Sequence, residues 1–274
     1  MSVMVSVLRR VARRLRRLLR GSSSAPQYAV ADRNAFVGLI PLTNSVLEIG
    51  PFAQPVLRGP HLRYVDVLST EDLRKRARAL GMDETKVPNI GWVSNGSDLS
   101  VVNDTFDAVV SSHAIEHQPD FVGHLNQVAD LLKPNGSYYL LVPDHRYCFD
   151  HFLTPSTVAQ VLGAHLENRT VHSLSSVVEH RALTTHNDPA RHWAGDHGDP
   201  NENRASRIAS AIQEISDANG AYIDVHAWYF TPRSFREVIT DLSATKHISF
   251  SVQRMFPTRP NSNEFWAILQ KHDD

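Results

Sequence analysis

The chain has 274 residues, of which 42% are hydrophobic, so it can bury a sizeable core in one large domain or in one domain with an insertion. Its single cysteine, Cys148, excludes an intramolecular disulfide and fits a reducing compartment such as the cytoplasm. The formal net charge is only −1, but residues 1–20 contain seven arginines and no acid, which leaves −8 on the remainder. A basic tail therefore precedes a mildly acidic body.

Residues 1–20 are predicted to form a basic amphipathic helix, because apolar side chains at 4, 8, 11, 15 and 18 make one stripe among the arginines. The apolar runs are too short to span a bilayer, and the arginines interrupt the apolar core of a secretory signal. We expect this helix to lie on an anionic membrane surface; a mitochondrial presequence and a solvated, disordered arm are the alternatives. Nucleic-acid binding is not expected, because the tail has no aromatic residue for stacking. Residues 21–27 are typical of a flexible linker.

Strands and helices alternate over residues 28–143, which predicts an α/β core with parallel crossovers and a sheet covered on both faces. A helical lead-in is expected over 27–44. The expected strands lie near 45–49, 62–67, 90–94, 106–112 and 137–142, the helices near 70–81 and 120–132, and a turn at Lys133–Gly136.

The alternation stops at Pro143, and residues 144–228 are predicted to form a helical insertion, with helices near 155–166 and 203–219. We expect this insertion to lie over the carboxyl ends of the strands and to bind an acceptor substrate, because ligands bind there in open α/β sheets. Residues 229–274 are predicted to complete the core. They contain a helix over 231–242 and strand-like segments at 247–255 and 264–270.

The turn after the first strand indicates a nucleoside-containing cofactor. The strand ends at Gly50, and the next strand ends at Asp66, whose carboxylate can accept hydrogen bonds from both ribose hydroxyls. A dinucleotide needs a G-x-G-x-x-G turn to hold its pyrophosphate, but Phe52 occupies the position of the second glycine, and Pro51 and Pro55 remove two N–H donors. S-adenosylmethionine (SAM) has no phosphate. The turn therefore argues against NAD and permits SAM.

Further signals follow in order: Phe106-Asp-Ala-Val-Val-Ser-Ser112, then Glu116-His117, then Lys133-Pro-Asn-Gly136 and a strand. Together with the glycine turn and the acid of the second strand, they make residues 40–145 resemble the class I SAM-dependent methyltransferases, specifically the methyltransferase type 11 group. The resemblance implies a Rossmann-like sheet, mostly parallel with an antiparallel C-terminal strand, and SAM as cofactor. The family's second and third glycines are replaced by Phe52 and Gln54, so a membrane-tethered SAM-binding module without catalysis is an alternative.

The predicted cofactor-binding residues follow from this placement. They are Glu48, Gly50, Phe52, Asp66, Asn95, Gly96, Asp98, Ser112 and His113. Glu48 is expected to orient the turn or the SAM amino group, and Asp66 to bind the ribose. The resemblance implies that residues 95–98 contact adenine and that Ser112 and His113 line the cleft near the transferring methyl group.

The spacing His113-x-x-Glu116-His117 is also that of inverted zinc peptidases, whose two histidines bind zinc beside a glutamate base. Here the segment directly follows an apolar strand and precedes a helix start at Asp120, which favours the methyltransferase. A second group, His192, Asp196, His197 and Asp199, has the residue types for a divalent metal or a polyhydroxyl substrate, but loop histidines are more often solvated. No metal ligands are predicted.

The strand exit Pro143–Asp150 is the most polar in the chain, and a hydroxyl acceptor requires a base within hydrogen-bond reach. Asp144, His145 and Tyr147 are the predicted catalytic residues, His145 first because an unperturbed imidazole titrates near neutral pH. The alternative is that they only anchor the insertion. Trp193, His226, Trp228 and Tyr229 are candidates for stacking on a sugar, although buried packing is the commoner role.

The exit pattern P-D-x-R-Y-x-F-D is similar to that of proteins encoded among enzymes of glycan and cell-surface polysaccharide biosynthesis. This resemblance implies SAM-dependent O-methylation of a sugar or lipid-linked glycan at the inner membrane face. A small-molecule or carboxyl methyltransferase is the alternative within enzymes.

Overall fold

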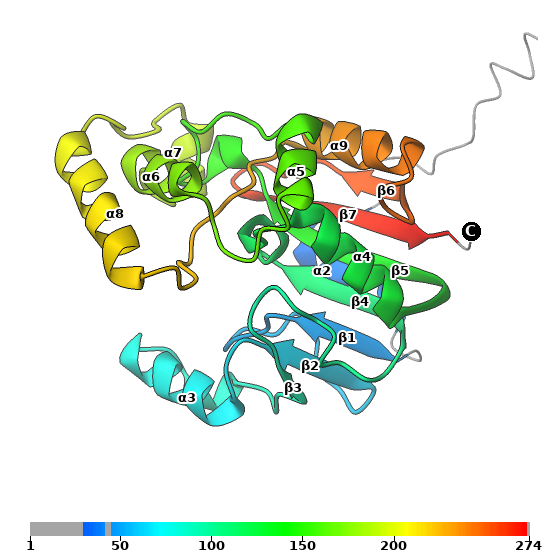
Figure 1. Cartoon of the computed structure of the whole chain (residues 1–274). Coiled ribbons are helices and arrows are strands. Elements are labelled where there is room, and N and C mark those ends of the chain that lie inside the picture. The colour runs from blue at the N-terminus through cyan, green and yellow to red at the C-terminus, as the bar shows by residue number, and fades with distance from the viewer. Residues whose placement is uncertain (1–29, 42–44, 273–274) are drawn as a thin grey trace, which may run out of the picture. The chain divides into compact units, whose positions relative to one another are not determined.

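The computed structural model describes residues 30–41 and 45–272 (Figure 1). The predicted basic helix over residues 1–20 and the linker over 21–27 lie outside these residues. The chain divides into two compact units at residue 32, and the account below concerns the second unit. Within the described residues, no helix is both long enough and apolar enough to cross a membrane.

A seven-stranded sheet with the order β3-β2-β1-β4-β5-β7-β6 forms the centre of this unit. Its strands are β1 (Val46–Ile49), β2 (Leu62–Asp66), β3 (Trp92–Val93), β4 (Phe106–Ser112), β5 (Leu132–Pro143), β6 (Phe250–Phe256) and β7 (Glu264–Lys271). The first five strands are parallel, and β7 runs antiparallel to both β5 and β6. The predicted mostly parallel α/β sheet with an antiparallel C-terminal end is confirmed.

Helices cover the sheet and the edge at which its parallel strands end. They are α2 (Arg33–Val37), α3 (Thr70–Ala79), α4 (Phe121–Leu131), α5 (Val158–Leu166), α6 (Leu174–Leu183), α7 (Pro189–Trp193), α8 (Arg204–Ala218) and α9 (Pro232–Ala244), with short 3-10 turns η1 (Glu84–Lys86), η2 (Ile115–His117) and η3 (His145–Tyr147). Helix α5 contacts α4 and α9, and α6 packs against α8. Figure 1 shows α6, α7 and α8 beyond the carboxyl ends of the parallel strands.

Buried aromatic rings pack against the sheet beside β7. Phe121 of α4 and Phe235 of α9 make edge contacts, and Phe235 also contacts Phe265 of β7. On α2, the ring of Phe36 stacks on Trp266 with centroids 5.5 Å apart. Such pairs add about 0.5–1.5 kcal/mol beyond their buried area. This packing anchors the antiparallel end of the sheet to the helices.

Two local predictions were wrong. The segment Lys133–Gly136 is not a turn before the strand but lies inside β5, where the pairing shifts from Phe106↔Leu132 to Ala108↔Ser137. The irregularity is accommodated by Asn135, whose φ of 58° is in the left-handed region that asparagine tolerates. Helices α6 and α7 were not predicted, because buried His180 and His192 occupy core-facing positions where an apolar residue would have shown the helical period.

A buried polar group links α4 to the sheet. The Tyr138 hydroxyl lies 2.8 Å from Ser111 Oγ and 3.1 Å from Nε2 of His124, and all three side chains are buried. Burial lowers the pKa of His124 to about 4, since an imidazolium would lose its hydration there. His124 is therefore a neutral hydrogen-bonding residue of the core at neutral pH.

His124 is expected to make the protein acid-sensitive. Its folded pKa of about 4 lies below the unfolded value of 6.5, so its contribution to stability is complete above pH 6.5 and is lost as the pH falls toward 4. The corresponding free energy is about 3 kcal/mol at most. The free energy of unfolding, measured with urea at several pH values, should decrease less between pH 6.5 and 4 in His124→Gln than in the wild type. Identical pH slopes would contradict this assignment.

Candidate cofactor and acceptor site

A cavity of about 420 Å³ lies at the carboxyl ends of β1 to β4. Its lining includes Ile49, Gly50 and Phe52 after β1, Val65 to Val67 at the end of β2, Ser94 to Gly96 after β3, and His113 and Ala114 after β4. Parallel strands end at the same edge of a sheet, which is where α/β folds bind ligands. The volume is typical of a small-molecule site.

The turn after β1 keeps a glycine-like backbone although it contains Phe52. Gly50 has a φ of 69° and Phe52 a φ of 43°, so both are left-handed. That conformation costs an L-residue about 1–2 kcal/mol. The Phe52 ring packs against a small apolar cluster that includes Ala53. The backbone N–H of Phe52 donates to Asp66 Oδ2 at 3.1 Å. Side-chain packing and this hydrogen bond together hold the strained residue in place.

Asp66 lies where the prediction placed it, at the tip of β2 and in the cavity lining. Its two oxygens accept N–H groups of Phe52 and Val67, the latter at 2.7 Å, and only 8% of the residue is exposed. Burial raises the pKa of this carboxyl. Each carboxylate oxygen has a second lone pair, so Asp66 can still accept hydrogen bonds from ribose hydroxyls.

Glu48 holds the loop after the turn and does not line the cavity. Its Oε1 accepts the Val56 N–H at 2.6 Å and its Oε2 accepts the Leu57 N–H at 3.3 Å. Burial raises its pKa to about 7. Of the two roles predicted for Glu48, these contacts correspond to orienting the turn.

The loop after β3 contributes two of its three predicted residues to the cavity, Asn95 and Gly96. Asn95 Oδ1 accepts the backbone N–H groups of Ser97 and Asp98 at 3.1 and 3.0 Å, which shapes the loop. Asp98 is not in the lining, because its carboxylate caps the N–H of Ser100 at 2.8 Å.

Of the two residues predicted at the exit from β4, only one lines the cavity. Ser112 does not line the cavity and instead accepts a hydrogen bond from Arg33 of α2 at 2.9 Å. His113 does line it, with a φ of 50° and its Nε2 2.9 Å from the Glu264 carboxylate. A non-glycine residue in this conformation at a cavity wall is the kind of strain that functional sites retain.

The sequence analysis missed several polar lining residues: Arg76, Ser94, His117, Gln118, His124, Tyr222 and Asp224. His117 appeared in a motif, but nothing in the motif said which way it points. Arg76 lies on α3 among other arginines with no distinguishing pattern, and Tyr222 and Asp224 belong to a loop more than 100 residues from the strand ends. No sequence motif marks Tyr222 or Asp224 as a site residue.

The predicted catalytic residues lie outside this lining. Asp144 is fully buried and binds Arg146 Nε at 2.9 Å and the Thr258 hydroxyl at 2.5 Å. Tyr147 stacks on Trp193 with centroids 4.0 Å apart. His145 is buried, which lowers its pKa, and its Nδ1 has no hydrogen-bond partner among the described residues. The contacts of Asp144 and Tyr147 anchor the start of the segment after β5.

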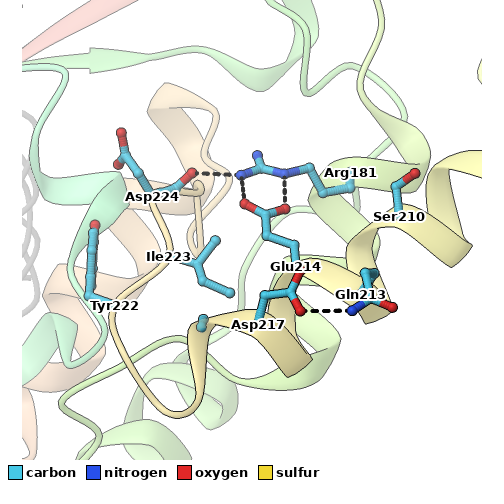
Figure 2. Close-up of a pocket in the computed structure, with 9 residues that line it drawn as sticks. Arg181, Ser210, Gln213, Glu214, Asp217, Tyr222, Ile223 and Asp224 are labelled. Atoms are coloured by element: carbon cyan, nitrogen blue, oxygen red, sulfur yellow. Dashed lines mark hydrogen bonds and ion pairs between the residues drawn. The ribbon is translucent and has the colours of Figure 1, made fainter.

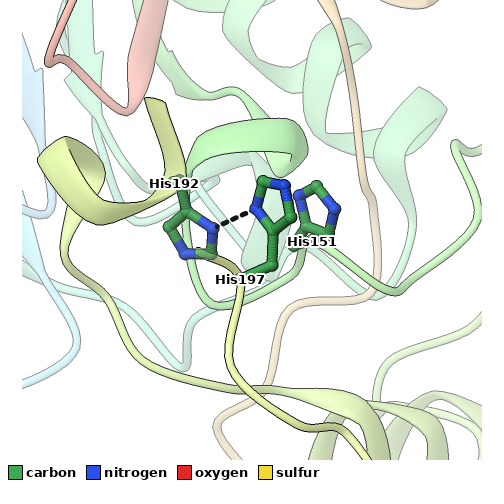
Figure 3. A group of neighbouring side chains, drawn as sticks. All are labelled: His151, His192 and His197. Atoms are coloured by element: carbon green, nitrogen blue, oxygen red, sulfur yellow. Dashed lines mark hydrogen bonds between the residues drawn. The ribbon is translucent and has the colours of Figure 1, made fainter. Parts of the chain in front are cut away.

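The histidine-rich loop forms a stacked cluster of His151, His192 and His197 (Figure 3). The rings of His151 and His197 are parallel with centroids 3.5 Å apart, and Nδ1 of His192 lies 3.0 Å from Nδ1 of His197. Asp196, which the sequence grouped with them, pairs with Arg191 at 2.7 Å. The cluster is held by ring stacking and by a nitrogen–nitrogen hydrogen bond.

A second, open pocket of about 720 Å³ is called the outer pocket below (Figure 2). It adjoins the cavity at the strand ends, which we call the cofactor cavity because predicted cofactor-binding residues line it. It is lined by Arg181, Ser210, Gln213, Glu214, Asp217, Ala218, Tyr222, Ile223 and Asp224. Figure 2 shows the Arg181 guanidinium paired with both oxygens of Glu214, each at 2.9 Å, and bound to the Asp224 carbonyl. Tyr222 and Asp224 line both cavities, so the two share a wall.

The hydrogen-bonding groups of the cofactor cavity fit SAM better than a dinucleotide. A carboxylate lies at the tip of β2, where a ribose is expected, and the Phe52 N–H that would otherwise meet a phosphate already donates to that carboxylate. A family model described as "Methyltransferase domain" matches residues 23–241, most of the chain. The chain belongs to the methyltransferase-domain family. It is a SAM-dependent methyltransferase, as the sequence motifs predicted.

Solved methyltransferases are similar to this chain at low identity. The CcbJ methyltransferase of Streptomyces caelestis is 12% identical with a TM-score of 0.43, over 92% of this chain and 98% of that chain. A SAM-dependent methyltransferase of Mesorhizobium loti is 13% identical with a TM-score of 0.44, over 88% and 99% of the two chains. One from Aquifex aeolicus is 10% identical with a TM-score of 0.44, over 90% and 94%. Comparison with curated proteins gave no significant match.

The strain at Phe52 in this methyltransferase predicts an unusual order of stability. Phe52→Gly and Phe52→Ala both lose the ring packing, but only alanine keeps a side chain at a φ of 43°. Phe52→Gly should therefore be more stable than Phe52→Ala by about 1 kcal/mol in urea unfolding. Ala53 is the control, because its φ is not positive and Ala53→Gly should destabilise. Equal stability of the two Phe52 variants would show that the residue is not strained.

Proposed function

We propose that the enzyme methylates a hydroxyl of a sugar or glycan-type acceptor bound in the outer pocket. The observation that carries this proposal is the wall, Tyr222 and Asp224, that the outer pocket shares with the cofactor cavity. Most of the other side chains in the outer pocket are hydrogen-bonding groups rather than apolar ones. These groups can bind the hydroxyls of a sugar, while the apolar surface between them can contact its ring carbons.

SAM supplies a methyl group on a positively charged sulfur and needs no further activation. The chain has to hold the acceptor in line and to accept the proton of its hydroxyl. On the α6 and α8 side of the pocket, Arg181 is bound to Glu214 and Gln213 Nε2 donates to Asp217, and the remaining N–H groups of both side chains can donate to an acceptor. Burial lowers the pKa of His145, the predicted base, and so favours the neutral form that a base requires. His145 lines neither cavity, so it can accept the proton only if the reacting hydroxyl and the methyl group of SAM meet beside it.

The non-catalytic alternative loses its supporting observation. It rested on the replacement of a family glycine by Phe52, yet Phe52 takes the left-handed conformation for which glycine is normally used. The backbone of the turn is therefore retained.

The acceptor class is tested with a panel of sugars, sugar nucleotides, oligosaccharides and carboxylic acids, each incubated with methyl-labelled SAM. The proposal predicts label in a sugar product that survives mild alkali, because an ether is stable where a methyl ester is hydrolysed. Label only in alkali-labile products would indicate a carboxyl methyltransferase.

Gln213→Ala tests the pocket itself. Removal of one neutral hydrogen bond should raise the KM for the acceptor about 2- to 10-fold and leave the KM for SAM unchanged. Gln253→Ala is the matched control, because Gln253 is an exposed residue of β6 outside both cavities. Equal effects of the two substitutions would remove the outer pocket from the proposal.

The arginine-rich residues 1–20 are proposed to place the enzyme on an anionic membrane surface, where each basic side chain contributes about 1 kcal/mol. The full chain should sediment with vesicles that contain an anionic lipid at low salt and be released at high salt. Neutral vesicles should not bind it. A chain lacking residues 1–20 that sediments as well as the full chain would contradict the proposal.

A further inference from the structure

Glu116 is a buried carboxylate without a hydrogen bond. It lies in η2, has no exposed surface, and neither of its oxygens has a hydrogen-bond partner among the described residues. Leaving a carboxylate in such a position is costly unless a cation or a proton compensates it. The groups around Glu116 therefore indicate what compensates its charge.

Imidazole nitrogens surround this carboxylate. Nε2 of His226 lies 3.7 Å and Nε2 of His117 lies 3.9 Å from Glu116 Oε1. One ligand atom from each of the three residues falls within 4.8 Å of the others. In a tetrahedral zinc site with bonds of about 2.0–2.2 Å, ligand atoms are about 3.3–3.6 Å apart. The present separations are slightly wider than these, so a small contraction onto an ion would produce the site.

Both histidines have a carboxylate at their other nitrogen. Asp150 Oδ2 lies 2.6 Å from Nδ1 of His226, and Asp224 Oδ1 lies 3.0 Å from Nδ1 of His117. Asp150 keeps the proton of His226 on Nδ1 and leaves its Nε2 with a free lone pair. The approach of Asp224 to His117 lacks hydrogen-bond geometry, so Asp224 supports His117 by its charge, and a small rotation of the imidazole would complete the hydrogen bond. This carboxylate–histidine arrangement is the usual support of metal-binding histidines.

The backbone also fixes the two ligand-bearing segments relative to one another. The Glu116 carbonyl accepts the Ala227 N–H at 2.8 Å and the Trp228 N–H at 3.3 Å. His226 therefore returns to η2 from more than 100 residues further along the chain. Because this hydrogen bonding joins the exit of β4 to the end of the insertion, the three side chains are held together before any ion binds.

We propose that Glu116, His117 and His226 bind a zinc-class divalent transition-metal ion. Two imidazoles and one carboxylate favour such an ion over Mg²⁺ or Ca²⁺, which prefer oxygen ligands throughout. His117 also lines the cofactor cavity, so the proposed ion would lie beside that cavity. The site differs from that of an inverted zinc peptidase, because Glu116 is a ligand rather than a base and His226 replaces the motif's first histidine, His113, as a ligand.

The stacked cluster His151, His192 and His197 is the competing candidate in the same chain. Its nitrogens are engaged with each other and with a backbone carbonyl, since Nε2 of His192 lies 3.0 Å from the His186 oxygen. Among the described residues, no carboxylate supports the rings of this cluster in the way that Asp150 and Asp224 support His226 and His117. It serves as the internal control.

The test is metal binding by the full-length protein after treatment with a chelator. Zn²⁺ is titrated in competition with a chromophoric chelator, and bound zinc is counted by elemental analysis. The wild type should bind one equivalent. Glu116→Gln, which keeps the shape and removes the charge, should weaken binding at least 10-fold, and the double variant His151→Ala/His192→Ala should bind as the wild type does.

Asp224→Asn provides a readout that does not depend on core packing, because the Asp224 side chain is 61% exposed. Loss of its support for His117 should weaken zinc binding about 10- to 100-fold without unfolding. Absence of zinc binding by the wild type, unchanged binding in both Glu116→Gln and Asp224→Asn, or loss only in the His151/His192 variant would each overturn the site. None of these measurements depends on the identity of the methyl acceptor.

Discussion

Asp66 joins the tip of β2 to the turn after β1, and the cofactor cavity depends on this contact. The carboxylate accepts the N–H of Phe52 and thereby stabilises a left-handed backbone that an L-residue otherwise avoids. Glu48 holds the next stretch of the loop by two further backbone N–H groups. A turn that lacks the family's second glycine can consequently keep its path. One buried acid thus shapes the wall of the site and also presents the group that a ribose would meet.

The other half of the site depends on how the insertion returns to the core. Backbone hydrogen bonds from residues 227 and 228 to Glu116 bring the end of the insertion to the exit of β4. The preceding residues Tyr222 and Asp224 then separate the cofactor cavity from the outer polar pocket. The same contact places His226 beside Glu116 and His117. The proposed acceptor pocket and the proposed metal site therefore have one structural origin.

Much of the core could be predicted from the sequence, because alternating apolar segments and acid-tipped strands report local structure directly. The positions of Gly50 and Asp66 followed from the strand ends themselves, whereas Asn95 and His113 were assigned from the resemblance to the methyltransferase family. The sequence could not show that Ser112 binds the distant Arg33 or that Asp98 binds the nearby Ser100 N–H, since both contacts depend on where side chains point. It also could not show that Glu116, His117 and His226 meet. Their proximity arises from the return path of a loop with no repeating pattern.

Titration of SAM into the protein tests most directly the claim that Asp66 holds the cofactor at the strand ends. The wild type should bind in the micromolar range. Asp66→Ala should weaken binding at least 10-fold, because hydrogen bonds to a charged group contribute about 1.5–3 kcal/mol. Asp98→Ala should bind as the wild type does, since Asp98 lies outside the cavity lining. Undiminished binding by Asp66→Ala, or no binding by the wild type, would contradict this account.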